Sequence, residues 1–243
     1  GQKFITCLKK FGIDYIQRGG NPWSGLAVDE QRGIVYVTTG DAHNTMEIPF
    51  SNKHSNSLIA IDINTGEILW SFQEISHDLW DLDLASFPVL TSIKTPNSKN
   101  KMVDVVLAIS KSGNTILLDR VTGKPIYPWR LEKTPIPNKT GISNTNTAAY
   151  FPNPLLPEKL LNQSITVNDL TNIGSENYKS ALASFKTLST VFPYKSPHDT
   201  SISEKLKGVL VFGVNGGGLW PGPSVDPNTG IMYVATNNTG RIL

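Results

Sequence analysis

Short apolar runs separated by polar turns extend over much of the chain, and four of these turns follow one pattern. In each, an Asp is followed four residues later by a Gly, with residues typical of strands on both sides. The pairs are Asp29 with Gly33, Asp62 with Gly66, Asp119 with Gly123, and Asp226 with Gly230. An Asp carboxylate accepts hydrogen bonds from turn amides, and Gly adopts the positive φ that ends such a turn. Each pair therefore predicts a β-hairpin.

Short antiparallel strands with regular turn signals are typical of a sandwich, a barrel or a propeller. The first three turns, starting at residues 29, 62 and 119, are 33 and 57 residues apart. Propeller blades of four strands take about 40–50 residues each, and two similar hairpins per blade would give this irregular spacing. The pattern favours an all-β fold, a β-propeller built of four-stranded antiparallel blades.

Residues 130–207 interrupt the hairpin pattern and are rich in Asn, Ser, Thr, Lys and Pro. Within them, residues 176–188 look helical, because Leu182, Phe185 and Leu188 fall on one helical face. The segment 23–39 resembles 220–236, so one structural unit occurs on either side of the interruption. We expect a single propeller domain, with blades in 1–129, an inter-blade insertion with a short helix in 130–207, and an incomplete blade in 208–243.

Composition narrows the class of protein. The 243 residues are 39% hydrophobic and 17% charged, which suits a packed core and excludes wholesale disorder. The net charge is +2 and the basic residues are scattered, so no nucleic-acid partner is expected. The single cysteine, Cys7, excludes an internal disulfide and a multi-cysteine metal site. The chain starts at Gly1 and shows neither a signal peptide nor an apolar run of about 18 residues, so we expect an internal piece of a longer protein.

The densest candidate chemistry lies in residues 77–83, HDLWDLD. Alternation along an extended segment would place Asp81 and Asp83 on one side and direct Asp78 elsewhere. Two carboxylates on one side can hold a hard cation, and a further group can act as a base. A polar loop around a buried Trp80 explains the same residues without any chemistry.

Three other features allow a functional and a structural interpretation. Residues 38–44, TTGDAHN, could ligate a cation or form an ordinary turn. Lys111, within SKSGN, could contact an anionic cofactor or be solvated. Trp23 and Trp220 follow glycines and could stack on a flat ligand or pack between blades.

Taken in order, five strings resemble the pyrroloquinoline-quinone (PQQ) dependent, or quinoprotein, dehydrogenases. They are NPWSGLAVDEQRGIVYVTTGD, SLIAIDINTGEILWSFQ, HDLWDLDLASFPVL, AISKSGNTILLDRVTGKPIYP and NGGGLWPGPSVDPNTGIMYVATNN. The resemblance is strongest to the membrane-type glucose and polyol dehydrogenases. It implies an eight-bladed propeller with PQQ and a divalent cation on its axis. This chain would supply only some of the blades, so activity of the isolated chain is not expected.

The resemblance also implies roles in cofactor binding. Trp23 matches the Trp that forms the floor beneath the PQQ ring. Lys111 matches the basic residue that contacts the quinone oxygens, and Asn237 matches an Asn that contacts PQQ. A PQQ-binding arginine and a metal-binding glutamate of the family would lie outside this chain.

The resemblance also implies which residues bind the metal and which residue acts as the base. Asp81 matches the catalytic base and lies beside the metal. Asp41 stands where the family usually has a metal-ligating Asn. The carboxylate of Asp41 can still donate an oxygen, but it adds a negative charge. Asp83 follows the base by two residues, a feature of calcium- or magnesium-dependent relatives and of some lanthanide-dependent ones. The implied cation is therefore Ca²⁺ or Mg²⁺, with a lanthanide as the alternative.

The implied reaction is oxidation of a sugar or alcohol hydroxyl by hydride transfer to metal-bound PQQ, with Asp81 as base. Electrons would pass to ubiquinone or a cytochrome, in the periplasm or at the periplasmic face of the inner membrane. Any membrane association would come from parts outside this chain. The alternative is a non-catalytic propeller of the same repeat type that acts as a protein-binding scaffold.

Overall fold

Antiparallel strands dominate the computed structural model, which describes residues 20–41, 54–76, 78, 80–95, 98–99, 101–133, 150–162, 164–189 and 208–242. Four of them form the first sheet, in the order β1-β2-β3-β4. They are β1 (Leu26–Asp29), β2 (Ile34–Thr38), β3 (Ser57–Asp62) and β4 (Ile68–Gln73). Asp29 Oδ1 accepts a hydrogen bond from the Arg32 amide in the first turn, and Asp62 Oδ1 accepts two amides in the second. These two predicted hairpins are confirmed.

A second antiparallel sheet follows, in the order β5-β6-β7. Its strands are β5 (Val89–Lys94), β6 (Met102–Ile109) and β7 (Thr115–Asp119). After the turn that ends at Gly123, with φ 69°, the chain returns beside β7 and Leu118 bridges to Pro125. A four-stranded blade would have a fourth strand here, but only this single bridge forms. Proline has no N–H to donate to a neighbouring strand, which limits the pairing.

The two sheets enclose a common core. Its buried residues come from both sheets and from the loop before β5: Ile34, Tyr36, Leu58, Ala60, Leu84, Val106, Ala108, Ile116 and Leu118. Trp70 of β4 packs against this core, 5.8 Å from the Tyr36 ring, and a Cβ added at Gly123 would lie 2.6 Å from the indole. Trp70 is therefore a blade-packing residue.

A charged cluster ties the two sheets together at the turn ends of their strands. Asp29 Oδ2 lies 2.8 Å from Arg32 Nη1 and 3.1 Å from Arg120 Nη1. Arg32 also pairs with Asp104 on β6. Burial acts to raise the pKa of Asp29, but the hydrogen bonds from the two arginines outweigh it and lower that pKa overall. The buried Asp29 thus remains a carboxylate at neutral pH.

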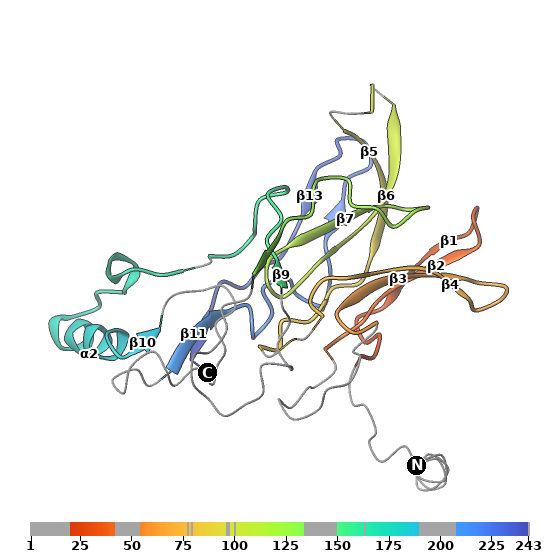
Figure 1. Ribbon diagram of the computed structural model, residues 1–243. Helices are drawn as coiled ribbons and strands as arrows, with labels where there is room; N and C mark the ends of the chain where they lie inside the picture. The colour runs from red at the N-terminus through yellow and green to blue at the C-terminus, as the bar shows by residue number, and fades with distance from the viewer. Residues whose placement is uncertain are drawn as a thin grey trace, which may run out of the picture.

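The rest of the described chain is less regular (Figure 1). It contains two further small pairings, β8 with β9 and β12 with β13, and a sheet in the order β10-β11-β14. The elements are β8 (Leu131–Lys133), β9 (Tyr150–Pro152), η1 (Val167–Asp169), α2 (Ser175–Phe185), β10 (Leu188–Ser189), β11 (Gly208–Phe212), β12 (Ser224–Val225), β13 (Met232–Tyr233) and β14 (Gly240–Ile242). The turn from Asp226 to Gly230 joins β12 and β13, as predicted.

The predicted helix exists but is shorter than expected. It ends at Phe185, whereas the sequence pattern predicted 176–188. Leu188 instead starts β10, which pairs in parallel with β11, so a strand pairing overrides the helical periodicity at that residue. No helix among the described residues is both long and apolar enough to cross a membrane.

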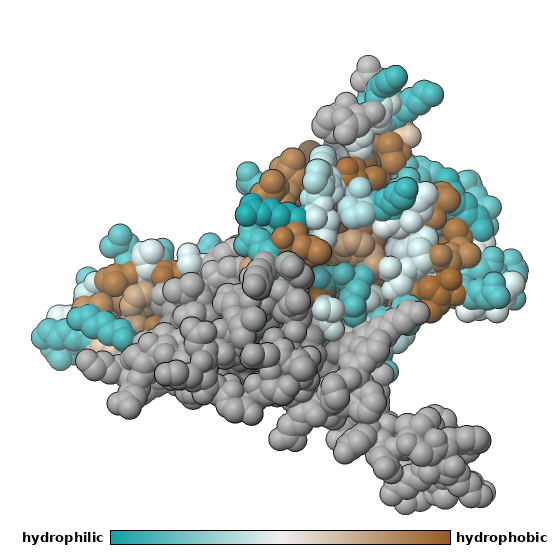
Figure 2. All heavy atoms as spheres, in the orientation of Figure 1, coloured by the Kyte–Doolittle hydropathy of each residue, from teal (hydrophilic) through white to brown (hydrophobic). Residues whose placement is uncertain are grey.

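Polar and apolar side chains alternate over the surface of the sheets, as the interspersed teal and brown atoms in Figure 2 show. Large apolar residues remain exposed on β1 and β4, the outer strands of the first sheet: Leu26, Val28, Ile68 and Leu69. Within the described residues, this sheet buries one face against its neighbour and leaves these outer positions open.

Candidate functional site

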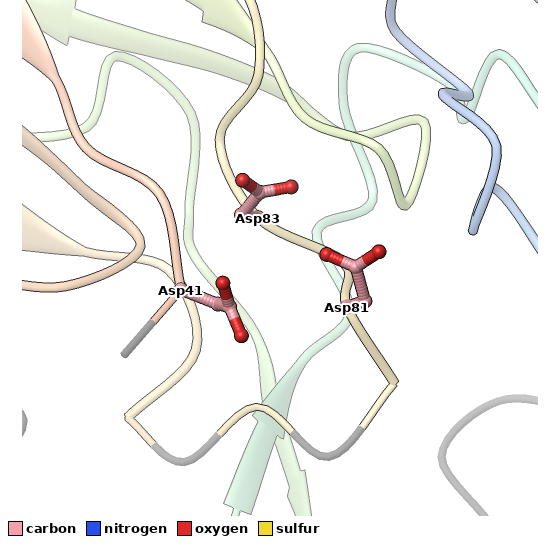
Figure 3. Close-up of side chains that lie close together, drawn as sticks. All are labelled: Asp41, Asp81 and Asp83. Atoms are coloured by element: carbon pink, nitrogen blue, oxygen red, sulfur yellow. The ribbon is translucent and has the colours of Figure 1, made fainter. Parts of the chain in front are cut away.

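Three carboxylates converge where the first sheet meets the loop between β4 and β5. Asp41 follows β2, while Asp81 and Asp83 belong to the loop. Each offers an oxygen that lies within 4.8 Å of the others, and Figure 3 shows the three carboxylates gathered around one space. Asp41 and Asp83 are largely buried, whereas Asp81 is exposed. Two segments about 40 residues apart in sequence thus build one acidic cluster.

Gly40 makes room for this cluster at the end of β2. A Cβ at this position would lie 3.0 Å from Asp83 Oδ2 and 3.1 Å from Trp23 Nε1. The Gly40 backbone is fixed on both sides, by its amide to Asn21 O at 3.1 Å and by its carbonyl to the Asn56 amide at 2.9 Å. The glycine before Asp41 is therefore required for the close approach of Asp83 and Trp23.

The loop that carries Asp81 and Asp83 is organised by Asp78. Asp78 Oδ1 accepts the Trp80 amide at 2.9 Å, and Oδ2 accepts the Leu82 amide at 2.7 Å and Asn56 Nδ2 at 2.9 Å. Trp80 and Leu82 are buried together in a second apolar cluster. The hydrogen bonds to Asp78 and the burial of these two apolar side chains fix the backbone on both sides of Asp81.

Asp81 itself has φ of 58°, in the left-handed region. The described residues between Gln73 and Val89 form no strand, so strand alternation is not what brings Asp81 and Asp83 together. The prediction of proximity was right and its reason was wrong: the hydrogen bonds to Asp78 curl the backbone. Asp and Asn tolerate this conformation better than other residues with side chains.

Lys111 completes the charged part of the site. It lies in the turn between β6 and β7, where its amide donates to Asp83 O at 3.1 Å. Its Nζ donates a hydrogen bond to Asp81 Oδ1 at 2.8 Å. The same Nζ lies 2.7 Å from Asp83 Oδ1 and forms an ion pair with it. Burial acts to lower the pKa of Lys111, but the two carboxylates outweigh it and raise that pKa, so the side chain is a cation.

Trp23 reaches the same site from the segment before β1. Its Nε1 donates to Asp83 Oδ2 at 3.3 Å, and the residue is 51% exposed. Trp220, at the matching position of the second repeat, is 62% exposed. Neither indole belongs to the two apolar clusters of the described residues. The indole edge of Trp23 is anchored while much of the side chain stays open.

Asn237 stands apart from the side-chain cluster. Its amide donates to Gly217 O at 3.2 Å, and its Oδ1 accepts the Thr239 amide at 3.0 Å in a local turn. A Cβ at Gly217 would lie 2.0 Å from Lys111 O, so this glycine backs the Lys111 turn. Asn237 is thus near the site through its backbone neighbours. His43, Asn44 and His77 lie outside the described residues.

Sequence patterns missed the role of Asp78 and its partner Asn56. Burial raises the pKa of Asp78 to about 7, the negative charge of Asp41 adds to this, and the hydrogen bonds from Trp80, Asn56 and Leu82 oppose it. The signal available in the sequence was the spacing of Asp78 from Trp80 and Leu82, which suits a side chain that accepts amides two and four residues ahead.

The groups present suit a hard cation beside an open aromatic face. Three carboxylates and one ammonium carry a net charge of −2, which a divalent cation would neutralise. All three candidate ligands are oxygen donors, which calcium and magnesium prefer. Asp83 Oδ1 is buried and makes no hydrogen bond, and its neighbour is the Lys111 ammonium at 2.7 Å, so this oxygen already occupies a position that favours a positive charge. A flat anionic ligand could lie against the exposed indole of Trp23 with Lys111 at its edge.

Comparison with known proteins assigns these features to one family. The profile described as "PQQ: Glucose/ethanol/alcohol dehydrogenase, beta-propeller domain" matches residues 9–243. Quinoprotein glucose dehydrogenase A of Acinetobacter calcoaceticus is 32% identical over 226 residues, which cover 89% of this chain and 27% of that protein. A glycerol dehydrogenase large subunit of Gluconobacter thailandicus is 29% identical, with coverage of 90% and 29%.

Solved structures agree on the fold. A quinohemoprotein alcohol dehydrogenase from Comamonas testosteroni matches with a TM-score of 0.53 at 22% identity, over 92% of this chain and 26% of that one. The β-propeller prediction is confirmed. The chain spans less than a third of the length of the relatives named above.

Proposed function

Because the chain belongs to the PQQ-dependent glucose, ethanol and alcohol dehydrogenase family of β-propellers, we propose that the whole protein oxidises a hydroxyl group of a sugar or alcohol with PQQ as cofactor. One observation supports this most: Trp23, Asp41, Asp81, Asp83 and Lys111, which the sequence had singled out separately, lie together. A scaffold of the same repeat type has no need to bury an ion pair beside a cluster of carboxylates.

In this proposal the chain binds the cofactor through an aromatic face and a cation. Trp23 supplies the surface on which the flat ring system lies, and its Nε1 bond to Asp83 fixes the tilt of the indole. Lys111 would hold the cofactor at its quinone oxygens, where the positive charge of the ammonium would stabilise negative charge. PQQ, when bound, supplies the acceptor for the two electrons of the substrate. Asn237 contributes a further polar contact.

Asp81 acts as general base. Its carboxylate is exposed, so a substrate hydroxyl can reach it, and the left-handed backbone projects it away from the buried Trp80. Asp81 takes the hydroxyl proton onto a carboxylate oxygen as the substrate is oxidised. Lys111, which pairs with Asp81 Oδ1, is then shared between the base and the cofactor.

Asp41, Asp81 and Asp83 are the metal ligands from this chain. The cation they would hold is Ca²⁺ or Mg²⁺, because the charge of the four groups is balanced by two positive charges. A lanthanide ion, which carries three positive charges, is the alternative.

The rest of the proposal concerns parts beyond the site. Electrons pass to ubiquinone or a cytochrome, and the protein works in the periplasm or at the periplasmic face of the inner membrane. Residues 130–207 form an insertion between blades, and 208–243 belong to an incomplete blade. The family supports the proposed acceptor and location, and the interruption of the hairpin pattern supports the proposed insertion.

The function is tested by reconstitution of the full-length protein. PQQ is titrated with Ca²⁺ or Mg²⁺ present, and the holoprotein is then assayed with glucose, glycerol, ethanol and quinate against an artificial electron acceptor. We expect saturable PQQ binding and reduction of the acceptor with one substrate class. A folded protein that binds no PQQ would support the protein-binding scaffold instead.

Trp23→Ala should weaken PQQ binding by about tenfold, because an aromatic stacking face and its buried area are lost. The matched control is Trp70→Ala, which removes an indole from the blade core and should lower thermal stability with a smaller effect on PQQ affinity. Fluorescence titration of PQQ into both folded variants measures this. Equal PQQ affinities in the two variants would refute the assignment of Trp23.

Asp41→Asn should leave a working enzyme with an altered metal preference. The carboxamide keeps an oxygen at the ligand position but removes one negative charge from the cluster. We expect Ca²⁺ affinity to fall by about tenfold or less, and affinity for a trivalent lanthanide to fall further. Competitive metal titrations of the variant and the wild type measure the ratio. Complete loss of turnover at saturating Ca²⁺ would contradict this role.

A further inference from the structure

A further buried carboxylate, Glu74, lies beside the turn that carries Lys111, and its side-chain hydrogen bonds go to that turn. Glu74 follows the last residue of β4 and is only 4% exposed. Its Oε1 accepts three hydrogen bonds, from Ser110 Oγ at 2.8 Å, Ser112 Oγ at 2.9 Å and Asn114 Nδ2 at 2.7 Å.

All three donors belong to the turn that carries Lys111. Ser110, Ser112 and Asn114 are themselves buried, so without Glu74 the turn would hold polar groups away from water with fewer partners. The backbone of the turn has further partners: the Lys111 amide donates to Asp83 O at 3.1 Å, the Ser110 amide donates to Asn114 O at 3.0 Å, and the Gly113 and Gly218 amides each donate to Ser110 O at 3.0 Å. Glu74 supplies the shared side-chain contact, because one of its oxygens binds the side chains of Ser110, Ser112 and Asn114.

Glu74 also connects this turn to the loop of Asp81. Its amide donates to Asn56 O at 2.8 Å, and the Asn56 carboxamide donates to Asp78 Oδ2. Asp78 in turn curls the backbone at Asp81. The two partners of the Lys111–Asp81 ion pair are thus held by segments that meet at Glu74 and Asn56.

The contacts of Glu74 are strongest when it is ionised. Burial raises the pKa of Glu74 to about 6, while the bonds from Asn114, Ser110 and Ser112 and the nearby charge of Lys159 oppose that rise. At neutral pH the carboxylate therefore prevails, and charge-assisted hydrogen bonds are stronger than neutral ones.

We propose that Glu74 is a positioning residue for Lys111: by holding Ser110, Ser112 and Asn114 it fixes the turn that sets the Lys111 ammonium against Asp81 and Asp83. Lys111 then meets PQQ with its position already determined, which raises cofactor affinity. The proposal rests on the function proposed above, because it assigns Lys111 to the cofactor.

The test is a double-mutant cycle in the full-length protein, read by PQQ titration. Glu74→Ala should raise the dissociation constant of PQQ by about tenfold with Lys111 present. In a Lys111→Ala background, Glu74→Ala should raise the dissociation constant of PQQ by about twofold or less, because Glu74 acts through Lys111. Glu74→Gln keeps the acceptor oxygen and should restore affinity to within about threefold of wild type. An equal factor in both backgrounds would overturn the proposal.

Asp29→Asn is the matched control for general damage. Asp29 is as buried as Glu74 and as highly bonded, but it lies at the opposite end of β1 and β2 from Asp41. The Asp29→Asn variant should have a lower thermal stability, and its PQQ affinity should stay within about twofold of wild type. If Glu74→Ala does not fold, Ser112→Ala enters the same cycle, with an expected factor of about threefold and the same criterion of non-additivity.

A second readout separates this proposal from the function. In the protein without PQQ, the labelling of Lys111 by an amine-reactive reagent is followed by mass spectrometry. Glu74→Ala should speed the labelling of Lys111 about tenfold, because the freed turn exposes the ammonium, while Asp29→Asn should not. Unchanged labelling would refute the positioning role whether or not PQQ binds. Absence of PQQ binding by wild type, with faster labelling in Glu74→Ala, would refute the function alone.

Discussion

Asp81→Asn is expected to lower kcat of the full-length holoenzyme by about 10²–10⁴-fold, the usual contribution of a general base. PQQ affinity should stay close to that of the wild type. The carboxamide matches the carboxylate in shape but cannot take the hydroxyl proton of the substrate. Lys111 keeps its contact with Asp83 when the charge of Asp81 is removed, so the cofactor side of the site is preserved.

Asparagine is also the right replacement for the backbone. Asp81 has φ of 58°, and Asn occupies this region nearly as well as Asp does. Alanine there would add about 1–2 kcal/mol of strain and mix a folding effect with the chemical one. Single-turnover measurements at saturating PQQ and metal, with circular dichroism as a check on folding, give the answer. Turnover within a few-fold of wild type would place the base elsewhere.

Asp78→Asn is the comparison variant: strand alternation would direct Asp78 away from the site and so predicts a mild effect on kcat. The structure changes what this variant reports, because Asp78 accepts the Trp80 and Leu82 amides inside the protein. An amide group in place of one oxygen would face a donor, and an unsatisfied buried donor costs about 1–3 kcal/mol of folding stability. We therefore expect a lower melting temperature together with a smaller loss of kcat than Asp81→Asn gives.

The second large effect is expected for Asp83→Ala, which should raise the dissociation constant of Ca²⁺ by roughly 100-fold. Loss of groups that merely support a metal ligand costs about 10–100-fold, so removal of a buried ligand should reach the upper end of that range. Asp83 also contacts both Trp23 and Lys111. Its removal should therefore weaken PQQ binding as well, unlike Asp41→Asn.

Calcium titration of the metal-free full-length protein, by calorimetry, measures this effect. Asp104→Asn is the matched control, since Asp104 also pairs with a cation but does so between the blades, with Arg32. That variant should lose stability and keep its calcium affinity. If Asp83→Ala binds Ca²⁺ as wild type does, Asp83 is a partner of Lys111 and Trp23 alone and the metal lies elsewhere.

Local chemistry let the sequence predict the hairpins. The spacing of Asp62 and Gly66 is sufficient, because the carboxylate that accepts the turn amides and the glycine at positive φ are only four residues apart. The same holds for the order of the strings around Trp23, Asp81 and Lys111, which carried the resemblance to the family. Such patterns report interactions between near neighbours along the chain, and no knowledge of the fold is needed to interpret them.

Helix α2 shows where local reasoning stops. The helical spacing of apolar residues extended to Leu188, yet Leu188 belongs to β10 and pairs with β11, about 20 residues away. A hydrogen-bonded partner from elsewhere in the chain outweighs a helical preference that is small for each residue. The same limit applies at Asp81, whose conformation is set by the buried Asp78 and not by alternation.

The sequence by itself determined the fold class and the family, and it singled out the candidate site residues Trp23, Asp41, Asp81, Asp83 and Lys111. Tertiary structure alone decided that Asp41, Asp83, Lys111 and Trp23 share one space, and that Glu74 lies buried beneath the Lys111 turn. The physical reason is that ion pairs and burial depend on distance in space. Residues separated by 30 to 60 positions become neighbours only when two sheets pack against each other, and that packing is the sum of many weak contacts along the whole chain.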